Sequence, residues 1–296
     1  MISKAIFFAA VWTAGLSEGV AQEDWVFLDN GEIRLGVNRS AGAAIGWFSE
    51  SGKGVNLLNH YDHGRYLQQS WYGDADGSDW NGKPWVWNPV QGGGWRGEPA
   101  ETLELIADSA TALSAKTRPT HWATGKPIDD VIFEQWITLE GPVARVHFRM
   151  TYTGEKVNQP RHQELPAVFI NDQLTTLVHY DGDAPWTGAE LSKSEPGWPN
   201  ERREITEHWA AYIDPATNRG VGVYVPVADT ITCYRFSKPG AKGACSYFAP
   251  VKTMAIVPGF TFEYEIYLTK GTPEAMRNRF AAIHRKASDK GKMIKK

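Results

Sequence analysis

Residues 143–152 read VARVHFRMTY, and apolar and polar side chains alternate along them without a break. Successive side chains of a β-strand point to opposite faces, so the two kinds of residue separate onto two faces. The apolar face carries Ala144, Val146, Phe148, Met150 and Tyr152, and the polar face carries Arg145, His147, Arg149 and Thr151. The stretch is therefore predicted to be a strand with one face in a core and the other in solvent.

Similar strand signals extend from this stretch in both directions. They are short apolar or alternating runs bounded by turn residues, such as the hairpin signal Asn30-Gly31. The predicted strands cover residues 25–28, 33–38, 43–48, 67–72, 103–107, 110–117, 131–139, 143–152, 165–170, 175–180, 207–213, 221–225, 230–236, 253–256 and 260–268. In the strand 67–72, alternation places Leu67, Gln69 and Trp71 on one face and Gln68, Ser70 and Tyr72 on the other. Between them, residues 73–97 are so rich in Gly, Pro, Asp and Asn that we expect a long ordered loop there.

One helix is predicted near the C-terminal end. Thr272 has the N-cap position and Pro273 the first helical position, and Met276, Phe280 and Ile283 fall on one face. Many short strands with one terminal helix indicate an all-β fold, a large antiparallel sandwich rather than a βαβ fold. There is no repeat of fixed period, which argues against a propeller or a solenoid.

The N-terminal residues are typical of an export signal. Lys4 gives a positive n-region, residues 5–15 an apolar h-region, and Gly19-Val20-Ala21 a small-residue cleavage site. We expect residues 1–21 to be a signal peptide, residues 22–296 to form a single domain, and the protein to be secreted or periplasmic. The apolar run is too short to span a bilayer, so no membrane anchor is expected.

Composition narrows the classes of partner. The chain has 296 residues, 42% hydrophobic and 22% charged, which is ordinary for a globular protein. A formal net charge of -3 argues against nucleic acid, whose binding requires a clustered basic face. Neither composition nor motif indicates an oligomeric state.

The segment from Asn59 to Trp95 is the most unusual part of the chain. It holds five of the 13 Trp residues, interleaved with imidazoles, amides and a guanidinium. Aromatic faces cover the apolar C–H faces of a sugar ring, while amides, Arg and carboxylates bind its hydroxyls. The segment therefore predicts a carbohydrate site. Its candidate binding residues are His60, Asp62, Arg65, Gln69, Trp71, Trp85, Trp87, Asn88, Gln91 and Trp95.

Several longer stretches resemble a known group of proteins. They are residues 33–59 (IRLGVNRSAGAAIGWFSESGKGVNLLN), 62–73 (DHGRYLQQSWYG), 87–95 (WNPVQGGGW), 208–226 (HWAAYIDPATNRGVGVYVP), 260–268 (FTFEYEIYL) and 269–280 (TKGTPEAMRNRF). The chain is similar here to secreted bacterial proteins of the galactose mutarotase-like supersandwich group, whose domains occur in aldose epimerases, glycoside hydrolases and polysaccharide lyases. The resemblance implies a large antiparallel β-supersandwich and assigns no catalytic residue.

Two clusters are candidates for catalysis. The first surrounds His63 and Tyr72, with Arg65 and nearby amides able to neutralise a substrate carboxylate. This is what β-elimination on a uronic acid polymer requires, with His or Tyr as base and acid. The second is Arg161-His162-Gln163-Glu164, in which His162 and Glu164 share a face and form a candidate acid–base pair, with Arg161 as a binding residue. His208, beside Trp209, is one further candidate binding residue.

Glycosidic-bond cleavage is the predicted reaction, with β-elimination preferred. Hydrolysis by a pair of carboxylates, aldose epimerisation and carbohydrate binding without catalysis stay open as alternatives. Hydrogen-bonded structural roles are the alternative for each polar candidate residue.

No cofactor is expected. The turn carrying Asp74, Asp76 and Asp79 lacks the EF-hand spacing, and a solvated acidic turn is preferred to a Ca²⁺ site there. In an oxidising compartment, Cys233 and Cys245 are able to close a small disulfide loop worth roughly 3 kcal/mol.

Overall fold

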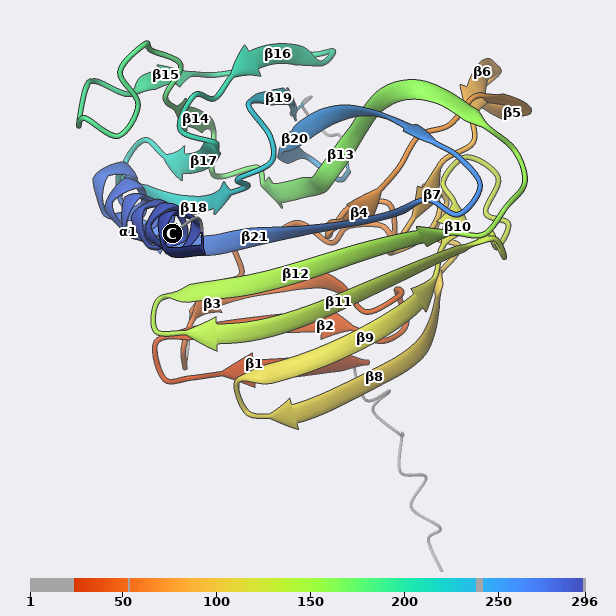
Figure 1. The fold of residues 1–296 in the computed structure, drawn as a ribbon, viewed down its shortest axis with the longest axis horizontal. Helices are drawn as coiled ribbons and strands as arrows, with labels where there is room; N and C mark the ends of the chain where they lie inside the picture. The colour runs from red at the N-terminus through yellow and green to blue at the C-terminus, as the bar shows by residue number, and fades with distance from the viewer. Residues whose placement is uncertain (1–23, 53, 238–241, 295–296) are drawn as a thin grey trace, which may run out of the picture.

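The computed structural model describes residues 24–52, 54–237 and 242–294, with side chains described up to residue 289 (Figure 1). The predicted signal peptide, residues 1–21, lies outside the described residues. Within the described part of the chain, no helix has the length and apolar character needed to cross a membrane.

Two large antiparallel sheets form the molecule. The first has ten strands. Its main path runs β1 (Trp25–Asp29), β2 (Ile33–Asn38), β3 (Ala44–Glu50), β4 (Leu67–Ser70), β13 (Asn158–Asn171), β20 (Cys245–Ile256), β19 (Thr230–Phe236) and β16 (Glu201–Glu204), and β7 (Pro89–Val90) joins β4 to β10 (Thr120–His121). This order places β13 and β20, which are far apart in sequence, side by side.

The second sheet has nine strands and lies against the first (Figure 1). Its order is β15 (Ser192–Ser194), β14 (Thr176–His179), β17 (Trp209–Asp214), β18 (Arg219–Tyr224), β21 (Thr261–Gly271), β12 (Val143–Tyr152), β11 (Val131–Glu140), β9 (Ala112–Arg118) and β8 (Glu101–Ser109). A separate hairpin is formed by β5 (Ala75–Trp80) and β6 (Lys83–Val86).

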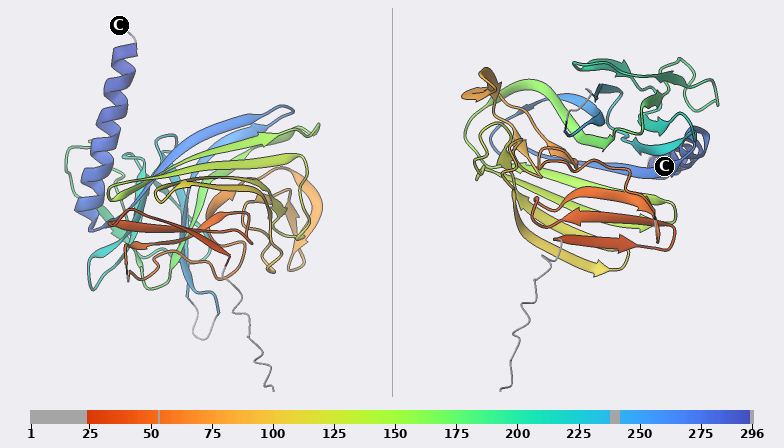
Figure 2. Two further views of the ribbon diagram at one scale, coloured as in Figure 1. Left: turned by 90° about the horizontal axis from the view of Figure 1, so that it is seen from below. Right: turned by 180° about the vertical axis from the view of Figure 1, so that it is seen from behind.

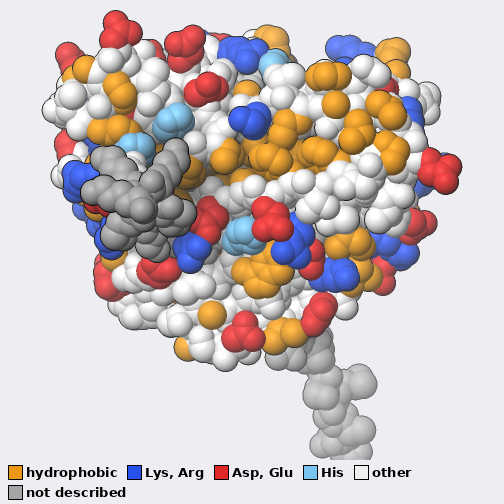
Figure 3. Space-filling view, viewed as in Figure 1, with side chains coloured by type: hydrophobic (Ala, Val, Ile, Leu, Met, Phe, Trp, Pro, Cys, Tyr) orange, Lys and Arg blue, Asp and Glu red, His pale blue; other side chains and the backbone are white. Residues whose placement is uncertain are grey.

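Strand β12 has the two faces predicted from its alternation. Ala144, Val146, Phe148 and Met150 are fully buried in the core between the sheets. On the other face, arginines and a histidine pair with β21 glutamates, as in the contacts of Arg149 Nε with Glu263 (2.8 Å) and of His147 Nε2 with Glu263 (3.0 Å). Acidic and basic side chains gather on this face (Figure 3). The outer face of β12 is thus solvated, as predicted.

The C-terminal helix α1 (Pro273–Ile294) stands at one end of the sandwich (Figure 2). Thr272 Oγ1 accepts a hydrogen bond from the Ala275 amide at 3.3 Å, as the predicted N-cap requires. Met276 and Phe280 are fully buried and pack against Trp209 and Tyr224 on the outside of β17 and β18. The structure therefore confirms the all-β supersandwich with one C-terminal helix.

Three strand predictions were incomplete, and β10, β15 and β16 were not predicted. Residues 73–97 are not an irregular loop but contain the β5–β6 hairpin and β7. Strand β13 begins at Asn158 and β20 at Cys245, several residues before the predicted starts. Pairing with a neighbouring strand supplies the backbone hydrogen bonds that keep these polar or irregular segments extended, and local sequence does not reveal that neighbour.

The predicted disulfide is wrong, because both cysteines are free and buried. In the β19–β20 ladder, Cys233 pairs with Phe248 and Cys245 pairs with Phe236. The cysteines thus lie three positions apart along neighbouring strands, about 10 Å along the chain direction. A disulfide needs Cα atoms within about 7 Å.

We expect thiol titration to find two reactive thiols per chain in denaturant and almost none in the folded protein. Burial raises the pKa of both Cys233 and Cys245 to about 11, so the nucleophilic thiolate is scarce and inaccessible. Ellman's reagent with and without guanidinium measures this. A chain without titratable thiols in denaturant would mean that the pair is oxidised.

Candidate functional site

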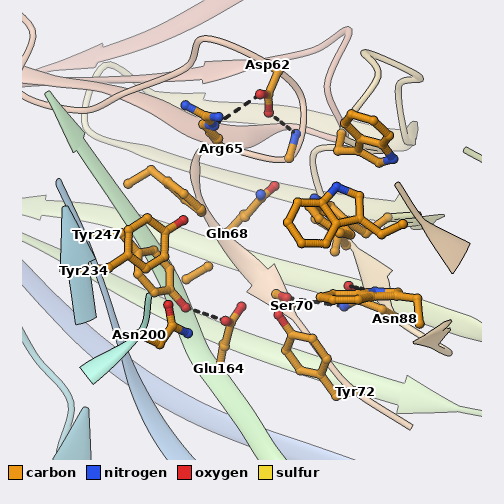
Figure 4. A pocket seen from close by; sticks show the side chains of 18 of the residues that line it. Asp62, Arg65, Gln68, Ser70, Tyr72, Asn88, Glu164, Asn200, Tyr234 and Tyr247 are labelled. Atoms are coloured by element: carbon orange, nitrogen blue, oxygen red, sulfur yellow. Dashed lines mark hydrogen bonds and ion pairs between the residues drawn. The ribbon is translucent and has the colours of Figure 1, made fainter. Parts of the chain in front are cut away.

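A cleft of about 350 Å³ lies on the outer face of the ten-stranded sheet (Figure 4). Strands β4, β13, β19 and β20 supply its floor and one side, and the β5–β6 hairpin and neighbouring loops supply the rest. It is lined by Asp62, Gly64, Arg65, Gln68, Ser70, Tyr72, Trp80, Trp85, Asn88, Val90, Trp95, Trp122, Glu164, Ala167, Phe169, Trp198, Pro199, Asn200, Tyr234 and Tyr247. We call this space the cleft.

Alternation along β4 places polar groups on the cleft floor. Gln68, Ser70 and Tyr72 line the cleft, while Gln69 and Trp71 face the core between the sheets. These are the two faces predicted for residues 67–72. The carboxamide of Gln68 is fully buried; its Oε1 accepts the Gly92 amide at 2.7 Å, and its Nε2 has no hydrogen-bond partner. That Nε2 is a buried donor ready for a ligand oxygen.

An irregularity in β13 aims Glu164 into the cleft. The register with β20 shifts between Glu164 and Val168. Leu165 and Val168 point into the core, whereas Glu164, Ala167 and Phe169 line the cleft. An extra residue in one strand reverses the alternation locally, which is how bulges redirect side chains.

Four indoles form one side of the cleft, which we call the tryptophan wall. Trp85 and Trp122 have ring centroids 4.9 Å apart, Trp80 lies 5.4 Å from Trp122, and Trp95 lies 6.4 Å from Trp122. Such clusters present large, rigid apolar faces.

One polar contact ties the hairpin of this wall to the body of the protein. His121 Nδ1 accepts the Ala123 amide at 3.2 Å, so His121 Nε2 carries the proton that it donates to Asp76 (2.8 Å). His121 is buried at the end of β10, and Asp76 belongs to β5. The contact thus fixes the side of the cleft that Trp80 and Trp85 form.

The opposite side is built by tyrosines, and we call it the tyrosine wall. Tyr234 and Tyr247 are direct partners across β19 and β20, and their rings stack at 4.5 Å. Phe169 packs against Tyr247 at 4.8 Å, and Trp198 meets Tyr234 edge-on at 4.8 Å. Two aromatic walls therefore face each other across a polar floor (Figure 4).

Glu164 is the carboxyl group of this floor. Burial raises its pKa above the ordinary value, and hydrogen bonds from Tyr247, Ser70 and Tyr72 oppose the rise. The Tyr247 hydroxyl donates to Glu164 Oε1. Burial also raises the pKa of Tyr72 and Tyr247 well above the usual range, so both hydroxyls stay protonated. Glu164 is thus a carboxyl group with a raised pKa that neutral hydroxyl donors hold in place, a combination typical of proton-transfer groups.

A second carboxyl group lies at the other end of the cleft (Figure 4). Asp62 pairs with Arg65 at 3.2 Å, and burial raises the Asp62 pKa while the Arg65 charge lowers it. Arg65 also donates to the Gly243 carbonyl. Asp62 and Arg65 therefore form an ion pair that the Gly243 carbonyl holds in place, so neither side chain presents an unpaired charge to the cleft.

The structure brings only part of the predicted site together. Seven candidates line the cleft, namely Asp62, Arg65, Tyr72, Trp85, Asn88, Trp95 and Glu164. Asn88 is oriented by donating to the Trp71 carbonyl at 2.7 Å. His162 lines an adjoining pocket that also includes Glu164, so the predicted common face of these two residues is confirmed.

Three predicted binding residues are instead structural and lie inside the sandwich. Trp71 is fully buried in the core and meets Phe260 and Phe262 edge-on. Gln69 donates to the Glu134 carbonyl (3.2 Å), and Gln91 donates to the Gln135 side chain (2.9 Å). The two glutamines donate to carbonyl oxygens buried between the sheets, which is why amides occur in this segment.

Five other predicted residues also lie outside the cleft lining. His63 packs against the backbone of the glycine segment 92–93, and Trp87 packs on Tyr152 at 5.6 Å. His60 contacts Trp25 at 5.2 Å, Arg161 pairs with Asp74 at 3.4 Å, and His208 contacts the Ala228 carbonyl at 2.8 Å. The polar groups of His60, Arg161 and His208 thus contact neighbouring loops and strands, whereas Nδ1 of His63 is buried without a hydrogen-bond partner.

The alternative calcium site does not form. Asp74 accepts the Gln159 amide, Asp76 contacts His121, and Asp79 accepts the Gly82 amide. The three carboxylates therefore turn to different partners, and no group of His, Cys, Asp or Glu among residues 24–52, 54–237 and 242–294 converges as metal ligands would.

Sequence reasoning missed the tyrosine wall, Trp198, Asn200 and the cleft-facing residues of β4. Gln68 and Ser70 had a signal, since the predicted alternation already placed them beside Tyr72. Trp80 and Trp122, which were not among the predicted binding residues, complete the tryptophan wall. Tyr234 and Tyr247 had no local signal, because only the pairing of β19 with β20 joins them.

Comparison with solved structures places the fold. The chain aligns with a galactose mutarotase-like protein from Lactobacillus casei ATCC 334 with a TM-score of 0.56 and 11% identity, covering 83% of this chain and 100% of that one. A candidate aldose 1-epimerase of Escherichia coli K12 gives a TM-score of 0.55 and 13% identity, covering 84% and 99%. A galactose mutarotase related enzyme from Lactobacillus acidophilus gives 0.51 and 12%, covering 84% and 97%.

No protein-family model and no curated protein sequence matches the chain. At this level of identity the alignments establish architecture alone. Element order, sheet topology and these alignments agree: the chain has the galactose mutarotase-like supersandwich fold.

Proposed function

We propose that this protein is a carbohydrate-active enzyme that binds a saccharide in the cleft and cleaves a glycosidic bond by proton transfer at Glu164. One observation carries the proposal: a carboxyl group with a raised pKa sits on a polar floor between two aromatic walls. Sugar rings offer apolar faces to such walls and hydroxyls to such a floor. The relatedness in fold to a candidate aldose 1-epimerase and to galactose mutarotase-like proteins is consistent with a sugar ligand.

Hydrolysis is the form of cleavage that the floor supports best. A general acid for a glycosidic oxygen needs a carboxyl group with a raised pKa, and burial raises the pKa of Glu164. Asp62, paired with Arg65, supplies a second carboxyl group at the other end of the same cleft. Gln68 Nε2 and Asn88 are placed to hold sugar hydroxyls.

β-Elimination is the second candidate, favoured by Arg65, Tyr72 and Asn88 lining the cleft. It ranks below hydrolysis for two reasons. The raised pKa of Tyr72 makes it a poor base, and Arg65, the one Lys or Arg among the described residues lining the cleft, is already paired with Asp62.

Incubation with a panel of neutral and acidic oligosaccharides tests the reaction. Hydrolysis gives new reducing ends without ultraviolet absorbance, whereas elimination gives an unsaturated, absorbing product. Anomer exchange without cleavage, followed by polarimetry, would replace cleavage with epimerisation, and binding without turnover would leave a carbohydrate-binding protein. The whole proposal fails if no saccharide is bound or changed.

Replacing Trp85 with Ala is expected to weaken saccharide binding by about tenfold, because the tryptophan wall loses a stacking face. Titration calorimetry measures the change. Trp136→Ala is the matched control, since Trp136 is an exposed indole on β11 outside the cleft. Equal losses in the two variants would contradict a role for the wall.

We also propose export, on the sequence of residues 1–21. An extracellular or periplasmic location would place the enzyme where polymeric saccharides occur. Fractionation of cells that express the full chain tests this, and retention of the uncleaved chain in the cytoplasm would refute it.

A further inference from the structure

A second pocket adjoins the cleft on the far side of Glu164. It holds about 340 Å³ and is lined by Tyr72, Trp85, His162, Glu164, Asn200, Glu201, Arg202, Thr232 and Val251. Tyr72, Trp85, Glu164 and Asn200 line both spaces. We call this space the side pocket. A saccharide chain crossing Glu164 would therefore pass from the cleft into the side pocket.

Arg202 is held over the side pocket by two other residues. His162 Nδ1 lies 2.8 Å from Thr253 Oγ1, and His162 Nε2 lies 2.8 Å from Arg202 Nη1. A guanidinium only donates, so Nε2 must be the acceptor and Nδ1 must carry the ring proton that Thr253 accepts. Both ring nitrogens are thus engaged, which makes His162 a positioning residue for Arg202 rather than a free base.

The charge of Arg202 is not balanced by a neighbouring carboxylate. Among the ion pairs of the described residues, none involves Arg202, which is exposed on the edge strand β16. Glu201 also lines the pocket, but Arg203 pairs with it and the Gly197 amide donates to it at 2.5 Å. Glu164 carries less negative charge than an ordinary carboxylate, because burial raises its pKa. The side pocket therefore holds one uncompensated cation.

We propose that the side pocket binds a sugar unit carrying an anionic substituent, a carboxylate or a sulfate, through Arg202 held by His162 and Thr253. Arg is well suited to such groups because its planar donors bind two oxygens at once. The inference rests on the proposed function. The substrate would be a saccharide chain with a neutral sugar unit in the cleft and an acidic sugar unit in the side pocket.

Affinity measurements with three oligosaccharides of equal length test the proposal: one neutral, one containing a uronate and one sulfated. Fluorescence of the tryptophans reports binding, since Trp85 lines both spaces. The wild-type protein is expected to bind an anionic chain about tenfold more tightly than the neutral one. Arg202→Gln should reduce this ratio to near 1. Comparing the uronate with the sulfate identifies the substituent.

Arg161→Gln is the matched control, because it removes the same charge at the residue next to His162 on β13, and Arg161 lines neither space. It should keep the preference. Equal affinities of the wild-type protein for all three chains, a preference that survives Arg202→Gln, or an equal loss in Arg161→Gln would overturn the side-pocket proposal. In those cases binding of the neutral chain leaves the proposed function standing, whereas no binding of any chain removes both proposals.

Discussion

Glu164→Gln is expected to lower kcat by about 10²–10⁴-fold, the usual contribution of a positioned acid or base, while saccharide binding persists. Gln keeps the shape of the side chain and still accepts a hydrogen bond from Tyr247, but it cannot exchange a proton. Kinetics on the substrate identified by the panel, together with calorimetric binding, measure both parts. Near wild-type turnover would remove Glu164 from the mechanism.

The same variant should not lose stability at neutral pH. A carboxyl group whose folded pKa is raised binds its proton more tightly in the folded state. Its contribution to stability is complete below the unfolded pKa and is lost as pH rises through the folded pKa. Gln has no such dependence, so thermal melting of Glu164→Gln relative to the wild type should improve as pH rises. A constant difference across pH would show that Glu164 titrates normally.

Tyr247→Phe is expected to change the pH dependence of the reaction rate. The Tyr247 hydroxyl donates to Glu164 and so favours its ionised form. Removing this hydroxyl is expected to raise the pKa of Glu164 further. The part of the pH–rate curve that reports the titration of Glu164 should therefore move to higher pH. A curve that stays in place would contradict the hydrogen bond as the cause.

Arg277→Met is expected to destabilise the fold by about 3–5 kcal/mol, since it leaves a buried carboxylate without its cation. Glu207 is fully buried, and Arg277 Nε donates to its Oε2 at 2.9 Å. Glu207 also accepts the Trp209 indole N–H at 2.9 Å, so this pair fastens helix α1 to the outside of the nine-stranded sheet. Denaturant unfolding monitored by fluorescence measures the loss.

Arg279→Met is the control for this experiment. Arg279 lies on the same helix and donates to the Lys270 carbonyl and Thr269 without a carboxylate partner among the described residues. Its loss should cost about 1 kcal/mol. The double variant Glu207→Gln with Arg277→Met should recover part of the stability, because it removes both charges. Equal losses in the free energy of unfolding of Arg277→Met and Arg279→Met would show that the ion pair contributes no more to stability than the hydrogen bonds of Arg279.

The prediction for β4 shows where sequence reasoning succeeded and where it failed. Alternation assigned Gln68, Ser70 and Tyr72 to one face and Gln69 and Trp71 to the other, and the structure has these faces. The failure lay in choosing binding residues by chemical type. Trp71 and Gln69 are of residue types that often bind sugars, but here both side chains are buried in the core between the sheets.

The sequence by itself determined the features that depend on a few neighbouring residues: the two faces of β12 and of β4, and the capped helix. The tertiary structure alone decided which of these residues meet. Glu164 and Tyr247 are 83 residues apart, and only the pairing of β13 with β20 brings them into contact. Alternation is a local consequence of backbone geometry, whereas strand order depends on which faces bury each other across the whole chain.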